Sequence, residues 1–215
     1  MSVQPDEIDK AWVEQPVRSG FVPVHAEPNV PLMNIANVLT MFRIAIVPVF
    51  VLALFTDGGH EPGWRIVAAA LFGIAAITDR FDGQLARKYG LVTDFGKLAD
   101  PIADKALIGS ALIGLSMLGD LAWWITLVIC GREIGVTLLR LVVVRRGVIP
   151  AGRGGKLKTL VQSLAIAVLV LPLPDNFLTA GMWLMYLAVA LTVYTGLDYL
   201  AQAARVWFAG AHSTR

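Results

Sequence analysis

Residues 79–104 read DRFDGQLARKYGLVTDFGKLADPIAD, and this stretch lies between the end of one long apolar run and the start of another. Four of its aspartates form two pairs, Asp79 with Asp82 and Asp100 with Asp104. A charged residue at the centre of a membrane helix costs roughly 2.5–3.5 kcal/mol on insertion scales, so such residues usually face a polar interior and have a function there. The stretch therefore predicts a polar site built between apolar helices.

The spacing of the aspartates predicts how they are arranged. Asp79 and Asp82 are three residues apart and Asp100 and Asp104 are four apart, so each pair lies on one face of a helix. Two such helices facing each other would hold four carboxylates around one small volume, which would be strongly anionic without divalent cations. Carboxylate oxygens suit magnesium, manganese or calcium, and magnesium also binds substrate phosphates. We therefore expect a metal site.

The composition supports a membrane protein. The chain has 215 residues, of which 56% are hydrophobic and 16% charged, and its mean hydropathy is +0.67, which is too apolar for an ordinary soluble domain. Its single cysteine, Cys130, lies in an apolar run and cannot form an internal disulfide. The net charge of +2 is too small to indicate nucleic acid as a partner. The acidic N-terminus has no pattern of a secretory signal.

Six apolar stretches are long enough to cross a bilayer, and they lie at about 35–56, 65–86, 98–118, 121–144, 157–174 and 177–203. If both termini are cytoplasmic, the three outer connections carry only Arg65, while nearly all other Lys and Arg residues lie on the inner side. This is the positive-inside pattern. We expect an all-α integral membrane protein with six transmembrane helices and a polar metal and nucleotide site at the cytoplasmic face.

The chain divides into three parts. The proline-containing residues 1–30 predict a cytoplasmic or membrane-surface arm, residues 31–208 the six-helix domain, and residues 209–215 a C-terminal tail.

Eight fixed positions in the stretch resemble the signature of the CDP-alcohol phosphotransferases, a family of integral membrane enzymes, and they are Asp79, Asp82, Gly83, Ala86, Arg87, Gly96, Asp100 and Asp104. The resemblance extends from about Asn34 to Leu200. Shorter strings resemble one branch, the bacterial phosphatidylglycerophosphate synthases, and these strings are residues 100–105, Arg132–Glu133 with Arg140, and residues 155–159.

The resemblance implies an activity in phospholipid biosynthesis. The chain would be a transferase that moves the phosphatidyl group from CDP-diacylglycerol to glycerol 3-phosphate, giving phosphatidylglycerophosphate and CMP. The metal ligands would be Asp79, Asp82, Asp100 and Asp104, holding two Mg²⁺ ions, with Mn²⁺ as the alternative. Asp104 would also be the catalytic base. The spacing by itself does not choose the base among the four carboxylates.

Two further groups of residues are candidates for substrate binding. The CDP-lipid would be bound by Asn37, Gly83, Arg87 and Thr93, because a glycine allows close approach and an arginine offers a planar fork to a phosphate. The phosphate of the acceptor would be bound by Arg132, Arg140, Lys156 and Lys158. For the second group, a self-neutralising Arg–Glu pair and a basic loop attracted to anionic lipid are the structural alternatives.

Other functions remain open at this point. Within the family, inositol phosphate, serine or phosphatidylglycerol is the alternative acceptor. A divalent-cation transporter is a remote alternative, because it predicts acidic residues through the membrane depth in repeated halves, and this chain has them at one face only. The resemblance also implies a homodimer in the bacterial inner membrane, with membrane lipids as partners.

Overall fold

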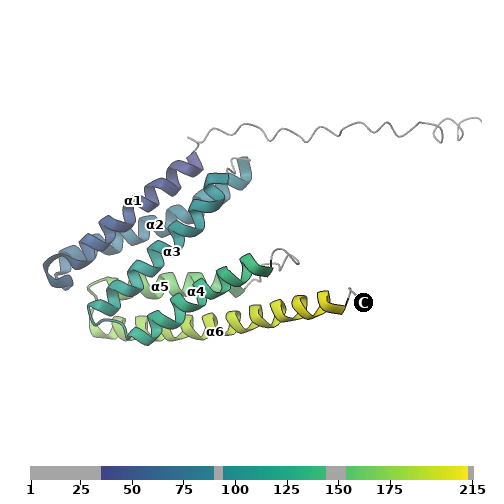
Figure 1. The fold of residues 1–215 in the computed structure, drawn as a ribbon. Helices are drawn as coiled ribbons and strands as arrows, with labels where there is room; N and C mark the ends of the chain where they lie inside the picture. The colour runs from purple at the N-terminus through teal and green to yellow at the C-terminus, as the bar shows by residue number, and fades with distance from the viewer. Residues whose placement is uncertain (1–34, 90–93, 144–153, 213–215) are drawn as a thin grey trace, which may run out of the picture. The chain divides into compact units, whose positions relative to one another are not determined.

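In the residues that it describes, the computed structural model consists of helices and the short connections between them (Figure 1). It describes the backbone of residues 35–89, 94–143 and 154–212 and the side chains of residues 35, 37–79, 99, 101–139 and 155–205. All of these lie in the compact unit Leu32–Arg215, so the arm predicted at residues 1–30 lies outside the described residues. The elements are α1 (Ile35–Phe55), the short 3-10 helix η2 (Thr56–Gly59), α2 (Pro62–Tyr89), α3 (Asp94–Met117), α4 (Trp123–Val143), α5 (Gly154–Val170) and α6 (Asp175–His212). The prediction of an all-α fold is confirmed.

The two helices that carry the aspartates are longer than their apolar runs. Helix α2 continues to Tyr89 and α3 already begins at Asp94, so all four aspartates lie inside helices. Pro101 therefore lies in the interior of α3 rather than in its first turn. Because proline has no amide hydrogen, the helical hydrogen bond from residue 101 to the carbonyl of Lys97 is missing, one turn before Asp104.

The helices pack in two groups. Helix α1 packs on α2 and α3, and α6 packs on α4 and α5. The groups meet where α5 contacts α2 and α3 and where α4 contacts α3. The core includes Phe50 of α1 and Phe72 of α2, whose ring centroids are 5.9 Å apart. Helices α3, α4 and α5 are thus neighbours, which places residues distant in sequence around one volume.

Large apolar side chains also cover the outside of the helices. Leu52, Trp183 and Tyr194 are 70%, 70% and 72% exposed. Within the described residues, two segments are long and apolar enough to cross a membrane, Asn37–Gly59 with a mean hydropathy of 2.5 and Asp175–Arg205 with 1.7. Only 33% and 22% of these segments are buried, whereas the core helix of a soluble protein would be mostly buried. The exposed apolar faces fit a lipid environment.

A buried arginine ties together three connections between helices. Arg65, only 6% exposed, donates from Nε to the Gly59 carbonyl, from NH1 to the Leu169 carbonyl at 3.3 Å, and from NH2 to Asp120. Asp120 also lies 3.4 Å from His60. We call Arg65, Asp120 and His60 the Arg65 cluster. It joins the end of η2, the α3–α4 connection and the end of α5.

Candidate active site

Helix α1 presents a buried polar stripe. Asn37, Thr40 and Arg43 recur at three-residue spacing and are 3%, 1% and 0% exposed. Arg43 NH1 lies 2.8 Å from Asp79 Oδ1 on α2. A fully buried arginine is unfavourable unless it is paired, so this ion pair fixes the first aspartate of the motif against α1.

Arg43 was not among the site residues predicted from the sequence. A signal for it exists, because an arginine inside an apolar run needs an acidic partner on a neighbouring helix. Asn37, predicted to bind the CDP-lipid, lies on the same buried stripe as Arg43.

Two of the four motif aspartates have described side chains. Asp79 is 42% exposed in spite of its arginine partner, and Asp104 of α3 is half-buried. The negative charge of Asp79 acts on Asp104, and α2 packs against α3. Asp82 and Asp100 lie in the same two helices, but their side chains are outside the described residues, as are those of Gly83 and Arg87. Thr93 lies outside them altogether.

The described carboxylates fit a hard cation. Asp79 has a second oxygen besides the one that Arg43 contacts, and partly exposed carboxylate oxygens are the donors that magnesium prefers. Within the described side chains no group of three acidic, histidine or cysteine residues lies close enough to hold a metal ion. The other two predicted ligands, Asp82 and Asp100, lie outside the described side chains, so the four-aspartate metal site stays a prediction.

A cavity of about 250 Å³ lies between α3, α4 and α5. Its polar lining comes from all three helices and consists of Asp104, Lys105, Glu133, Lys158, Thr159 and Gln162. The remaining lining is apolar and consists of Ile108, Gly109, Ile113, Ile129, Cys130 and Ile134. The cavity brings together Asp104, the predicted base, and Lys158, a predicted ligand of the acceptor phosphate.

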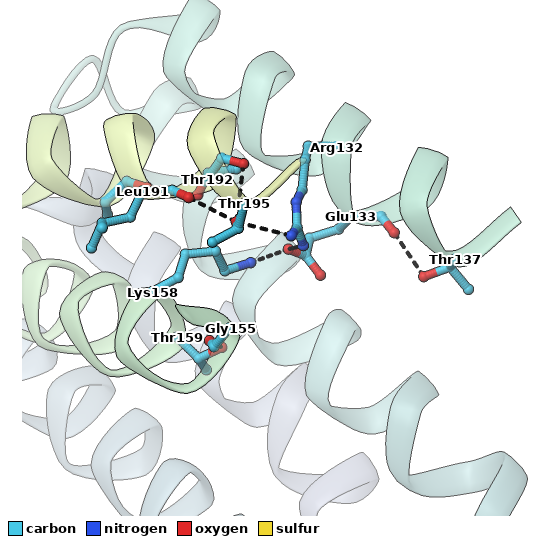
Figure 2. Close-up of polar contacts among 10 residues, drawn as sticks. Arg132, Glu133, Thr137, Gly155, Lys158, Thr159, Leu191, Thr192 and Thr195 are labelled. Carbon is cyan, nitrogen blue, oxygen red and sulfur yellow. Dashed lines mark hydrogen bonds and ion pairs between the residues drawn. The ribbon is translucent and has the colours of Figure 1, made fainter. Parts of the chain in front are cut away.

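Glu133 of α4 holds two cations on one oxygen (Figure 2). Lys158 Nζ from α5 pairs with Glu133 Oε1, and Arg132 NH1 lies 3.1 Å from the same oxygen. Arg132 NH2 donates to Thr195 Oγ1 of α6 at 3.0 Å. We call Arg132, Glu133, Lys158 and Thr195 the Glu133 cluster. It links α4, α5 and α6 beside the cavity.

The four predicted acceptor residues have different surroundings. Lys158 is 4% exposed and lines the cavity. Arg132 belongs to the Glu133 cluster but does not line the cavity, and Lys156 is exposed on α5 away from it. The side chain of Arg140 is outside the described residues. The cavity also contains Lys105, which the sequence analysis did not select, although it directly follows Asp104.

Residues 33–194 match the model of a family described as CDP-alcohol phosphatidyltransferase. The chain is 61% identical over 174 residues to a protein of Mycobacterium tuberculosis (strain H37Rv) named "Probable phosphatidylglycerophosphate synthase", a match covering 81% of this chain and 83% of that protein. It is 40% identical over 187 residues to the CDP-diacylglycerol–glycerol-3-phosphate 3-phosphatidyltransferase of Bacillus subtilis (strain 168), covering 80% of this chain and 95% of that one. The protein of that name from Rickettsia bellii is also 40% identical, over 172 residues that cover 77% of this chain and 93% of the relative.

Proposed function

The chain belongs to the CDP-alcohol phosphatidyltransferase family, and from this premise we propose that it transfers the phosphatidyl group of CDP-diacylglycerol to glycerol 3-phosphate. The products are phosphatidylglycerophosphate and CMP. The names of relatives at 40–61% identity, each matched over most of its length, support this acceptor.

One observation of the structure carries the proposal. Asp104 lines the same cavity as two lysines, Lys105 and Lys158, so a proton acceptor and positive charge face one enclosed volume. Glycerol 3-phosphate needs both, because its hydroxyl must lose a proton and its phosphate must be bound. A small acceptor held in this way also has little freedom to move, which lowers the entropic part of the barrier.

The reaction balances on these groups. The acceptor hydroxyl oxygen attacks the phosphorus that carries the diacylglycerol, and its proton passes to the carboxylate of Asp104. The bond between that phosphorus and the bridging oxygen of CMP breaks, and CMP leaves with the electron pair. The positive charge near the cavity favours the doubly charged acceptor over a neutral alcohol.

The metal ligands in this proposal are Asp79, Asp82, Asp100 and Asp104. Magnesium, or manganese in its place, would supply neutralisation of the diphosphate charge when bound. Arg43 keeps Asp79 in one position by their 2.8 Å contact. The nucleotide part of the donor is assigned to Asn37, Gly83, Arg87 and Thr93.

The membrane arrangement is also part of the proposal. All six helices cross the bacterial inner membrane, with both termini and the site on the cytoplasmic side, and the protein is a homodimer. The exposed apolar faces of the helices and the one-sided distribution of Lys and Arg support the multi-pass arrangement. The acyl chains of the donor then stay in the bilayer while its head group reaches the aspartates.

A panel of acceptors tests the proposal. Purified protein with CDP-diacylglycerol and magnesium is offered glycerol 3-phosphate, inositol phosphate, serine or phosphatidylglycerol, and CMP release is measured. We expect glycerol 3-phosphate to be the fastest acceptor and the Asp104→Asn variant to be inactive with all of them. A faster reaction with any other acceptor would contradict the assignment.

A further inference from the structure

We propose that Lys105 binds the phosphate of the acceptor directly and thereby selects a phosphorylated alcohol. The inference rests on the proposed function, since it concerns the acceptor of that reaction. Lys105 is a half-buried residue of α3 and lines the cavity together with Asp104. Lys105 was not among the substrate-binding residues predicted from the sequence.

Lys105 differs from the other cations near the cavity in its partners. Lys158 and Arg132 both contact Glu133 Oε1, so a phosphate that took either of them would have to replace a carboxylate. Among the described residues, Lys105 has no ion pair or hydrogen bond, although its charge acts on both Asp104 and Glu133. Its ammonium group is therefore available to an incoming anion without breaking an existing contact.

The position of Lys105 also suits a short acceptor. Asp104 and Lys105 are consecutive in α3, and both reach the cavity because a lysine has a long flexible stem. A phosphate at Lys105 leaves the other end of a three-carbon molecule near Asp104. The opposite wall carries the Glu133–Lys158 pair, which adds no net charge. Among the described residues, Lys105 is thus the lysine of the cavity lining whose charge is not used in an ion pair with a carboxylate.

The test compares Lys105→Met with the wild type in the CMP-release assay. We expect the KM for glycerol 3-phosphate to rise by about tenfold or more, because a charge-assisted contact is lost, while kcat and the KM for CDP-diacylglycerol change by less than about threefold. Lys105→Arg retains the charge and should restore most of the affinity. Arg205→Met, which removes an exposed cation of α6 outside the cavity, is the matched control and should behave as the wild type.

A second measurement uses inorganic phosphate as the probe. Phosphate should inhibit the wild type in competition with glycerol 3-phosphate, and Lys105→Met should weaken this inhibition by about tenfold. If Lys105→Met does not fold, Lys105→Gln is tested in the same two assays and should show the same changes.

The inference is overturned if the KM for glycerol 3-phosphate and the inhibition by phosphate are unchanged in the variant. It is also overturned if only kcat and its pH profile change, since Lys105 would then act on Asp104 rather than on the substrate. A wild type that does not use glycerol 3-phosphate would refute the proposed function instead, and that result appears before any variant is compared.

Discussion

The Arg65 cluster and the Glu133 cluster are both ionic groups that contain a buried cation and lie where helices meet, but they differ in how completely their polar atoms are used. Arg65 donates from Nε, NH1 and NH2 to two backbone carbonyls and to Asp120. Arg132 donates from NH1 and NH2, while its buried Nε has no hydrogen-bond partner among the described residues. Neither residue of the Arg65–Asp120 pair lines the cavity, whereas Glu133 and Lys158 do.

Whether all donors of a cluster have partners, and whether the cluster lines the cavity, distinguishes a structural cluster from a functional one better than burial does. A buried ion pair alone is weak evidence for either role, because its desolvation offsets much of its attraction. A cluster whose donors are all satisfied has no remaining capacity for a ligand, and we assign the Arg65 cluster to holding helix ends together. The Glu133 cluster keeps charge beside Asp104, and we assign it to the site.

The largest contrast is expected between two aspartates. Asp104→Asn should lower kcat by about a thousandfold, since it removes the proposed base, while Asp120→Asn should leave kcat within about twofold. CMP release at saturating substrates measures both, and thermal unfolding verifies that both variants are folded. Comparable losses of kcat in the two variants would remove the distinction between the clusters.

The next contrast concerns the two arginines. Arg65→Met leaves two carbonyls and Asp120 without their donor and should destabilise the protein by about 3–5 kcal/mol, with KM values unchanged in the fraction that remains folded. Arg132→Met should destabilise the protein less than Arg65→Met does and should raise the KM for glycerol 3-phosphate. The melting temperature of each variant and its KM values for glycerol 3-phosphate and CDP-diacylglycerol test these two expectations. An Arg65→Met variant with normal stability would show that the Arg65 cluster does not hold the helix ends.

Two lysines of α5 sharpen the assignment within the site. Lys158→Met leaves the carboxylate of Glu133 without its lysine partner at the cavity, where it would repel an anionic acceptor, and should raise the KM for glycerol 3-phosphate by about tenfold. Lys156 is exposed and does not line the cavity, so Lys156→Met should raise this KM by clearly less. The KM for CDP-diacylglycerol should change in neither. If Lys156→Met raises the KM for glycerol 3-phosphate more than Lys158→Met does, the acceptor binds outside the cavity.

The smallest effect is expected at His60. Its side chain is 61% exposed and lies 3.4 Å from Asp120, and exposed pairs of this kind contribute about 0–1 kcal/mol. His60→Gln should therefore barely change the melting temperature and should not affect CMP release. A large loss of stability would show that His60, and not only Arg65, holds the Arg65 cluster together.

Except for the end of α6, which continues to His212 instead of ending at about 203, the helices were predictable from sequence to within a few residues, because long apolar runs separated by turn-forming residues are a local signal. The end of α2 and the start of α3 were predicted less accurately, since charged residues that face a polar interior lower the hydropathy of a segment without interrupting its helix. The helical positions of Asp79 and Asp104 were predictable because their spacing is local too, while their roles as metal ligands and base stay a prediction.

The partners across helices were not predictable. The pairing of Arg43 with Asp79, and of Lys158 with Glu133, depends on which helix faces meet, and no local pattern records this. For the same reason the sequence favoured Lys156, which is exposed, and did not select Lys105, which lines the cavity.

The central claim is that the acceptor occupies the cavity between α3, α4 and α5, and filling that cavity tests it most directly. Gly109 lines the cavity, and a Cβ added there meets no atom within 4 Å, so Gly109→Phe can place its ring inside without a backbone clash. Gly135 of α4 is equally free of neighbours but does not line the cavity, which makes Gly135→Phe the matched control. We predict that kcat/KM for glycerol 3-phosphate falls by about tenfold or more in Gly109→Phe and stays near the wild-type value in Gly135→Phe, with the KM for CDP-diacylglycerol unchanged in both. Equal kcat/KM values in the two variants would contradict the claim.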